Sequence, residues 1–228
     1  TLVESRMAYK STELKPAVRM VTDCISEAPI FSFIPIGCKV AGLFHSNSIK
    51  QTVPMKIKKA VIPAAGLGTR VLPASKSMPK EMLPIVDKPA IQYIVEEAVH
   101  SGIEDILIIT SRGKTTVEDH FDRNPELEAR LLASKKQEVY DEMVAISQMA
   151  NIQYVRQKET KGLGHAVLCA KAFVGNEPFA VLYGDDVVLG GEHPACWELC
   201  RAYEQFGVGV AGIKPVPIED ISKYCSLA

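Results

Sequence analysis

The sequence predicts an α/β fold of the Rossmann-like type, in which helices flank a mostly parallel β-sheet. From Lys56 onward, short apolar runs alternate with segments whose apolar residues recur every three or four positions, which is typical of successive βαβ units. The run EDILIIT, at 104–110, has four consecutive apolar residues, Ile106 to Ile109, as in strands buried on both faces of a parallel sheet. Ligands of such sheets bind beyond the carboxyl ends of the strands, so the loops there are where we expect function.

Each element is predicted from its own pattern. KKAVIPAA is a short apolar run that leads into a glycine-rich loop, and the helix that follows has Ile91, Ile94 and Val95 on one face and a stop signal at Gly102. We expect strands at 58–65, 104–110, 152–157, 178–186 and 208–215, and helical segments at 89–102, 115–121, 125–149, 162–174 and 194–207.

The segment before this alternating part has a different character. Residues 1–54 show no sustained helical or strand period and no motif to which chemistry can be attached. We expect residues 1–54 to be a poorly ordered N-terminal extension and residues 55–228 to form the folded domain. The apolar stretch at 28–44 contains two prolines and Lys39 and is shorter than the roughly 20 clean residues of a spanning helix. We therefore expect no membrane role.

Composition excludes several other classes of protein. The 228 residues carry a formal net charge of −1, which gives no reason to expect nucleic acid or an anionic membrane as the main partner. The six cysteines form no C-x-x-C pair, so neither a zinc site nor a disulfide framework is indicated. We expect reduced thiols and a cytoplasmic protein, in which any site for an anion is local.

The loop AAGLGTRVLPASKSMPK is the first candidate site. Its small residues, Ala64, Ala65, Gly66 and Gly68, leave the backbone amides uncovered, so that a flat base and a phosphate chain could approach closely. Arg70 and Lys80 add cationic donors for phosphate oxygens, between prolines that restrict the loop. A dinucleotide-binding G-x-G-x-x-G is excluded, because Val71 stands where the third glycine would be. An ordinary surface loop with solvated lysines is the alternative.

The stretch SRGKTT imitates the end of a phosphate-binding P-loop. The first glycine of that motif would fall at position 108, where the sequence has Ile108. We therefore interpret Thr115 or Thr116 as the N-cap of a helix, without a role in phosphate binding.

Two further segments follow predicted strands. YGDDV places Asp185 and Asp186 at the end of an apolar strand. Because adjacent strand residues point to opposite faces, we expect only one of the two carboxylates to bind Mg²⁺ while its neighbour makes hydrogen bonds in the loop; a turn-forming pair is the alternative. QKETKGLGHA offers Gln157, with a donor and an acceptor for a base edge, and Gly162, which lets backbone approach that base. His165 is interpreted as a structural residue at a helix start.

Three separate segments together carry a resemblance to a known family. KKAVIPAAGLGTRVLPASKSMPKEMLPIVDKPAIQYIVEEAV, VRQKETKGLGHAVLCA and FAVLYGDDVV agree in order and spacing with the bacterial UTP–glucose-1-phosphate uridylyltransferases, which are sugar nucleotidyltransferases with a Rossmann-like fold. The resemblance covers roughly 55–224 and makes residues 55–228 a nucleotidyltransferase domain. It also implies that the chain is truncated at its C-terminus, before the segments that complete the sugar and metal sites, so that the fold is incomplete there.

The resemblance implies a reaction and a role for each site residue. UTP and glucose 1-phosphate would give UDP-glucose and pyrophosphate, with Mg²⁺. Ala64, Ala65, Gly66, Gln157 and Gly162 would hold the uracil, Arg70 and Lys80 would neutralise the triphosphate as catalytic residues, and Asp185 would bind the metal. It also implies a homo-oligomer at full length. Two alternatives stay open, a transferase for another nucleoside triphosphate or sugar phosphate and a nucleotide-binding protein without catalysis.

Overall fold

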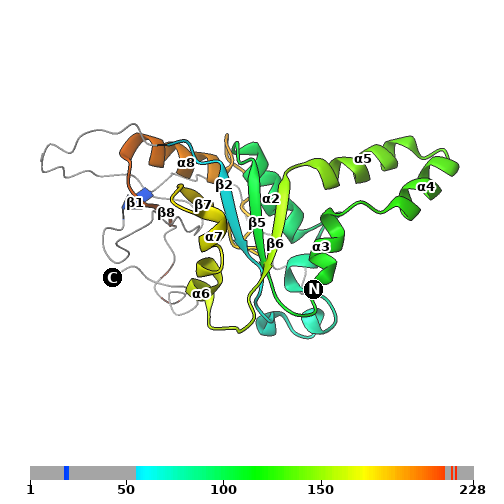
Figure 1. Cartoon of the computed structure of the whole chain (residues 1–228), viewed down its shortest axis with the longest axis horizontal. Coiled ribbons are helices and arrows are strands. Elements are labelled where there is room, and N and C mark those ends of the chain that lie inside the picture. Colours follow the sequence, from blue (N-terminus) through cyan, green and yellow to red (C-terminus); the bar gives the residue numbers. More distant parts are fainter. Residues whose placement is uncertain (1–17, 21–54, 214–216, 218, 220–228) are drawn as a thin grey trace, which may run out of the picture.

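The computed structural model describes residues 18–20, 55–213, 217 and 219, and its centre is a four-stranded parallel sheet (Figure 1). The strand order is β6 (Asn151–Arg156), β5 (Asp105–Thr110), β2 (Lys59–Pro63) and β7 (Phe179–Val181). Every adjacent pair in this sheet is parallel. The predicted α/β class and parallel sheet are confirmed.

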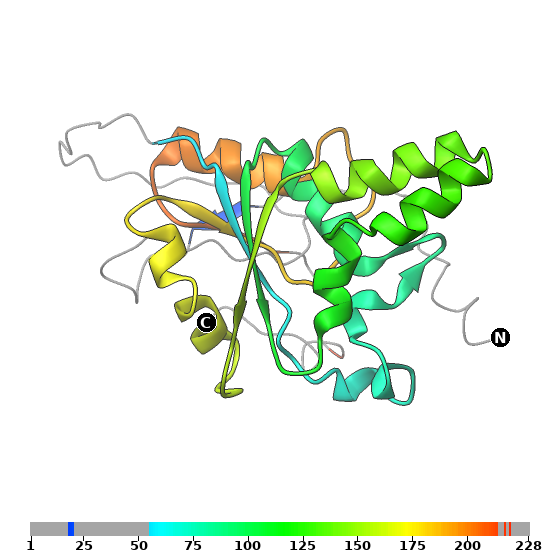
Figure 2. The same cartoon turned by 45° about the vertical axis from the view of Figure 1, so that its right-hand side comes forward.

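Helices cover both faces of this sheet because the strands are apolar on both faces. One face packs against α2 (Ala90–His100), α3 (Thr115–Phe121) and α8 (Ala195–Phe206), and the other against α6 (Leu163–Leu168) and α7 (Lys171–Val174), as Figure 2 shows. The hydrophobic core between the sheet and α2, α3 and α8 is called the first core, and that between the sheet and α6 and α7 the second core. Along β2, the side chains of Ala60 and Ile62 lie in the first core, whereas that of Val61 lies in the second. The continuous apolar runs of the sequence therefore reflect burial from two sides.

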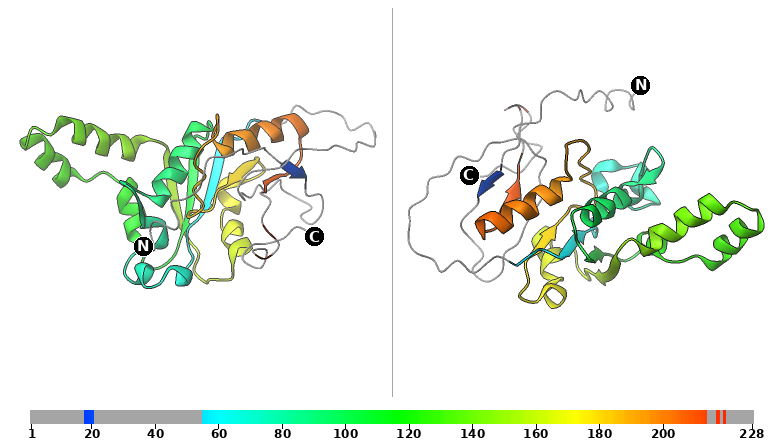
Figure 3. Two further views of the ribbon diagram at one scale, coloured as in Figure 1. Left: turned by 180° about the vertical axis from the view of Figure 1, so that it is seen from behind. Right: turned by 90° about the horizontal axis from the view of Figure 1, so that it is seen from above.

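The connection from α3 to β6 forms a helical arm. It consists of α4 (Pro125–Ala133) and α5 (Gln137–Gln148), which project beyond the sheet in Figures 1 and 3. The sequence predicted one helical stretch at 125–149. It divides at Ser134–Lys136, where Lys135 takes a left-handed conformation with φ of 58°. Ile146, near the arm's base, packs into the first core, while Leu132 and Val139 are exposed.

Several shorter elements complete the described part of the chain. The segment between β2 and α2 contains η1 (Thr69–Val71), η2 (Ala74–Lys76), η3 (Lys80–Met82) and a small hairpin of β3 (Pro84–Ile85) and β4 (Lys88–Pro89). β8 (Val210–Gly212) pairs antiparallel with β1 (Val18–Met20). Three residues of the expected N-terminal extension thus form a strand; the apolar stretch at 28–44 lies outside the described residues. Within the described ranges, none of the helices combines the length and apolarity needed to cross a bilayer.

Three local predictions were wrong. The helix at 162–174 is two helices, because the chain tightens into a turn at Cys169–Ala170, where the Ala170 amide donates to the Val167 carbonyl (2.9 Å). The last predicted strand does not join the parallel sheet, since β8 pairs with β1. Neither Thr115 nor Thr116 is the N-cap of α3; that position is Lys114, which makes no side-chain cap.

A partly buried carboxylate, that of Glu97, joins α2 and α8. Glu97 Oε1 on α2 accepts a hydrogen bond from the Cys196 backbone amide in the first turn of α8 (2.9 Å). Burial raises the pKa of Glu97 above its ordinary value of 4.5, and the hydrogen bond offsets this only in part. The folded chain therefore binds the Glu97 proton more tightly than the unfolded chain.

Replacement of Glu97 by Gln is expected to change how stability depends on pH. Because the folded-state pKa is raised, wild-type stability falls as pH rises from 4.5 through the raised value. The variant has no such titration, so its stability relative to wild type should increase over that range. Melting temperatures at about pH 4 and about pH 8 measure this, and a constant difference between the two proteins would contradict it.

Candidate nucleotide site

A cavity of about 720 Å³ lies beyond the carboxyl ends of β2, β6 and β7. It is lined by loops that are far apart in the sequence. The lining residues are Pro63, Ala65, Gly66, Leu67, Thr69, Arg70, Lys80, Glu81, Gln157, Thr160, Gly162, Leu163, Ala166, Tyr183, Asp185 and Asp186. The structure thus brings together all the predicted site residues except Ala64 and Gly68, which belong to the same loop but are not in the lining.

The first residue after β2, Ala64, still hydrogen-bonds to β5, and the chain then leaves the sheet as a loop. The Ala64 amide donates to the Ile109 carbonyl of β5 (2.8 Å), and Ala64 is 1% exposed. Gly68 has a φ of 70°, and a Cβ there would lie 3.1 Å from Ser75 Cβ and 3.3 Å from Lys80 Cβ. Glycine at this position therefore permits both the left-handed turn and the close passage of the Lys80 stem.

The two predicted cations differ in their surroundings. Lys80 Nζ donates to Asp185 Oδ2 at 2.6 Å, so the predicted catalytic lysine and the predicted metal ligand form an ion pair at the cavity. Arg70 is exposed, and it forms no ion pair within the described part of the chain. Its guanidinium is thus available to a phosphate group, whereas Lys80 would have to exchange Asp185 for one.

Gln157 is held by the loop that follows it. Its side chain is buried, and its Nε2 donates to the Gly162 carbonyl (3.1 Å) and to His165 Nδ1 (2.9 Å). Both amide hydrogens are therefore used, and only the carbonyl oxygen is left for a ligand. The expectation that Gln157 offers a donor as well as an acceptor is wrong in this arrangement. His165 lies in the first turn of α6, at a helix start as expected, and its Nδ1 is 2.9 Å from Gln157 Nε2.

The family comparison agrees with this geometry. A family model described as nucleotidyl transferase matches residues 59–224, which contain every residue of the cavity. The chain belongs to the nucleotidyl transferase family.

Individual relatives of this nucleotidyl transferase are more specific. UTP–glucose-1-phosphate uridylyltransferase YngB of Bacillus subtilis (strain 168) is 63% identical over 169 residues, which are 74% of this chain and 57% of the relative. A UTP–glucose-1-phosphate uridylyltransferase of Staphylococcus epidermidis is 57% identical over 169 residues, 74% of this chain and 58% of the relative. The chain therefore spans little more than half the length of these relatives.

Solved structures give the same result. UTP-bound UGPase from Acinetobacter baumannii is 48% identical with a TM-score of 0.64, over 66% of this chain and 54% of that chain. A UDP-glucose pyrophosphorylase complexed with UDP-glucose is 42% identical with a TM-score of 0.62, over 74% of this chain and 61% of that chain. The similarity to these structures confirms the fold of the nucleotidyl transferase.

The carboxylates after β7 differ from the expectation. β7 ends at Val181, and the Asp186 amide donates to the Tyr183 carbonyl (3.2 Å) in a turn, so the alternation of a strand does not apply to Asp185 and Asp186. Both residues line the cavity. Among the described residues there is no group of three or more histidines, cysteines or carboxylates that could hold a metal ion. A cation here would therefore depend on oxygen atoms of a ligand.

Two buried residues of the site were missed by sequence reasoning. Glu81 is 0% exposed and forms an ion pair with Lys114 (2.8 Å), whose side chain is 8% exposed. Lys114 was part of the stretch that imitates a P-loop, and Glu81 follows Lys80 directly. Neither residue type nor spacing indicates the pair, because the two residues come from different loops and meet only in the folded chain.

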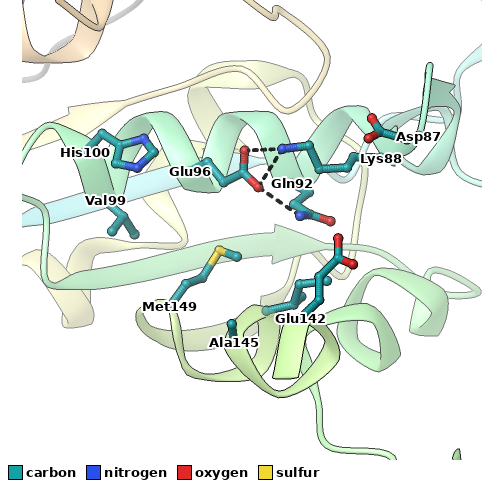
Figure 4. Close-up of a pocket in the computed structure, with 10 residues that line it drawn as sticks. Asp87, Lys88, Gln92, Glu96, Val99, His100, Glu142, Ala145 and Met149 are labelled. Atoms are coloured by element: carbon teal, nitrogen blue, oxygen red, sulfur yellow. Dashed lines mark hydrogen bonds and ion pairs between the residues drawn. The ribbon is translucent and has the colours of Figure 1, made fainter. Parts of the chain in front are cut away.

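A smaller groove of about 360 Å³ lies between α2 and α5 (Figure 4). Figure 4 shows that three of its polar side chains interact with one another: Lys88 Nζ donates to both oxygens of Glu96 (3.0 and 2.8 Å), and Gln92 Nε2 donates to Glu96 Oε1 (2.9 Å). The groove contains none of the predicted site residues and no glycine-rich loop. The larger cavity is therefore the candidate site.

Proposed function

We propose that this chain binds UTP and transfers its uridylyl group to glucose 1-phosphate, giving UDP-glucose and pyrophosphate. The observation that carries the proposal is the convergence of the small-residue loop, two cations, Gln157 and Asp185 on one cavity. The names of the relatives, uridylyltransferase and UDP-glucose pyrophosphorylase, support the choice of substrates. We further propose a cytoplasmic location and, at full length, a homo-oligomer.

Ala64, Ala65, Gly66, Gln157 and Gly162 would form the base pocket. The small side chains leave room for a flat ring, and Gln157 is fixed so that its amide oxygen is the group without a partner among the described residues. Uracil carries an N–H at ring position 3 that this oxygen can accept, whereas cytosine carries an acceptor there. The fixed amide therefore favours UTP over CTP.

Arg70 and Lys80 would bind the triphosphate as the catalytic residues. An oxygen of the sugar phosphate attacks the α-phosphorus, a new P–O bond forms, and the bond to the leaving pyrophosphate breaks. Such a transfer needs positioning and charge neutralisation and no covalent enzyme intermediate. The forked guanidinium of Arg70 can bind two phosphate oxygens, and the Lys80 ammonium supplies a point charge beside them. Gly68 gives the Lys80 stem room to reach this position.

Asp185 would hold Mg²⁺, and the site fits this ion. Mg²⁺ is commonly bound by one or two carboxylates together with substrate phosphates and water, not by a cage of protein ligands. Asp185 is 45% exposed in its side chain and lines the cavity together with Asp186. When bound, the ion would neutralise phosphate charge.

A nucleotide-binding protein without catalysis is one alternative. The chain spans 57–58% of its curated relatives, and the alternative holds if the acceptor site of those proteins lies outside the matched span. In that case the chain would bind UTP without turnover. A different sugar phosphate as acceptor is the other alternative.

Two measurements on one sample test the proposal. Isothermal titration of the chain with UTP and Mg²⁺, with CTP as the matched control, measures nucleotide binding; pyrophosphate release after addition of glucose 1-phosphate measures transfer. We expect UTP to bind more tightly than CTP, and release to follow. Binding without release with any sugar phosphate would support the non-catalytic alternative. A folded chain that binds no UTP would overturn the proposal.

A further inference from the structure

We propose that the buried ion pair of Glu81 and Lys114 is a positioning element, which turns the Ala64–Ala65 peptide so that its N–H faces the nucleotide cavity. This inference rests on the proposed function, because it assigns a task to two buried residues at the base pocket, of which Glu81 lines the cavity and Lys114 lies behind it. Neither side chain needs to contact the nucleotide.

Lys114 joins two parts of the site through its ammonium group. Nζ donates to Glu81 Oε2 at 2.8 Å and to the Ala64 carbonyl oxygen at 2.5 Å. The amide of Ala64 is held from the other side by the Ile109 carbonyl of β5 (2.8 Å). Both polar groups of Ala64 are therefore fixed, and the peptide that follows cannot rotate freely.

The geometry of a trans peptide then fixes the next amide. The only cis peptide bond in the described residues is Leu72–Pro73, so the Ala64–Ala65 bond is trans, with its N–H antiparallel to its C=O. With the carbonyl bonded to the buried Lys114, the Ala65 N–H points to the opposite side. Ala65 lines the cavity, and its amide makes no backbone hydrogen bond within the described part of the chain. It is thus a donor available to a ligand.

Glu81 connects the Ala64–Ala65 peptide to the segments that carry Lys80 and Asp185. It follows Lys80 directly in η3, and a Cβ at Gly184 would lie 3.2 Å from Glu81 Cγ and 3.5 Å from Ala64 Cβ. Gly184 in turn precedes Asp185. The Glu81 side chain therefore packs where the three segments that carry Lys80, Ala65 and Asp185 meet, so its displacement would alter all three.

Stability alone does not account for this pair. Removing two charges from water is costly, and a buried ion pair can often be replaced by apolar residues of similar size without loss of stability. Glu81 pays an additional cost, since its Oε1 is buried and has no hydrogen-bond partner among the described residues. A merely structural role would be filled equally well by two apolar side chains, and this difference provides the test.

The test replaces both Glu81 and Lys114 by apolar residues in the whole chain. In Glu81→Leu/Lys114→Met the volume is roughly kept and the donor to Ala64 is lost; the control Lys88→Met/Glu96→Leu removes the partly buried pair in the second groove, away from the cavity. We expect the Glu81/Lys114 variant to melt cooperatively, with a dissociation constant for UTP raised about tenfold or more. The control should bind UTP as wild type does. A folded Glu81/Lys114 variant with wild-type affinity would overturn the inference.

Two additions keep the test decisive. Glu81→Gln retains an acceptor for Lys114, so we expect an affinity between those of wild type and the double variant; this serves if the double variant does not fold. The ¹H–¹⁵N resonance of Ala65, recorded without nucleotide, should shift in Glu81→Leu/Lys114→Met and in Glu81→Gln. It should keep its wild-type position in the control Lys88→Met/Glu96→Leu. A resonance that does not move in these variants would overturn the positioning role, whether or not the wild type binds UTP. Failure of the wild type to bind UTP would contradict only the proposed function.

Discussion

Replacement of Lys80 by Ala is expected to lower the rate of pyrophosphate release by roughly 10² to 10³-fold, the usual cost of losing one well-placed donor to developing charge. The Lys80 stem runs beside Gly66 and Gly68, and its ammonium reaches the cavity at Asp185. The alanine variant keeps the loop but leaves the phosphates without this point charge. Single-turnover release of pyrophosphate, with UTP saturating, measures the effect on the chemical step.

Lys58→Ala is the matched control for this change. Lys58 also forms an ion pair, with Glu104 at 2.8 Å, but it lies at the amino end of β2, opposite the cavity. We expect Lys58→Ala to leave the rate unchanged and to shift the melting temperature little, since exposed ion pairs contribute little to stability. Near-normal release by Lys80→Ala would remove Lys80 from the catalytic residues.

Replacement of Asp185 by Asn is expected to remove the effect of Mg²⁺ on UTP binding. Asp185 accepts a hydrogen bond from Lys80 Nζ, so without a cation the carboxylate competes with phosphate for that ammonium. The amide cannot provide a charged ligand for Mg²⁺ and binds Lys80 more weakly. We therefore expect UTP to bind the variant at least as well as wild type in EDTA, and to gain nothing when Mg²⁺ is added. Titrations with and without Mg²⁺ give both constants.

Asp141→Asn provides the control for loss of a carboxylate. Asp141 lies on the exposed surface of α5 and accepts a hydrogen bond from Gln137 Nε2 (2.8 Å), remote from the cavity. Its replacement should leave the Mg²⁺ effect at the wild-type value. If Asp185→Asn also kept the full Mg²⁺ effect, Asp185 would not be the metal ligand, and Asp186 would be tested next.

The parts of the fold predicted from sequence are those determined by local pattern. The alternation of apolar runs and helical periods predicts β2, α2, β5, β6 and β7, and parallel strands bring the loops after β2, β6 and β7 to one edge. For this reason Gly66, Gln157 and Asp185 line one cavity although they are far apart in the chain. The strand order does not follow from the pattern, because it depends on which surfaces pack.

The residues that sequence reasoning missed owe their roles to the folded state. Lys114 follows a serine, an arginine and a glycine as in a phosphate-binding motif, yet its side chain is buried against Glu81, 33 positions earlier. Lys114 is also the N-cap position of α3, and it makes no side-chain cap because an ammonium group has no acceptor for the amides of the first turn. Likewise, the donor capacity of Gln157 is used by its own loop, a contact that depends on where Gly162 and His165 lie after folding.

The far end of the α4–α5 arm is a place where the chain can gain or lose residues without a change at the cavity. It leaves the sheet after α3 and returns at β6, and its far end, Ser134–Lys136, is exposed. The pairing of β5 with β6, from Asp105 opposite Asn151 to Thr110 opposite Arg156, is set by the strands themselves. Residues gained or lost at the tip would therefore lengthen or shorten the arm while the edge that carries Gln157 keeps its register. In evolution, this is where the domain can vary in size and acquire new surfaces at little cost to the chemistry.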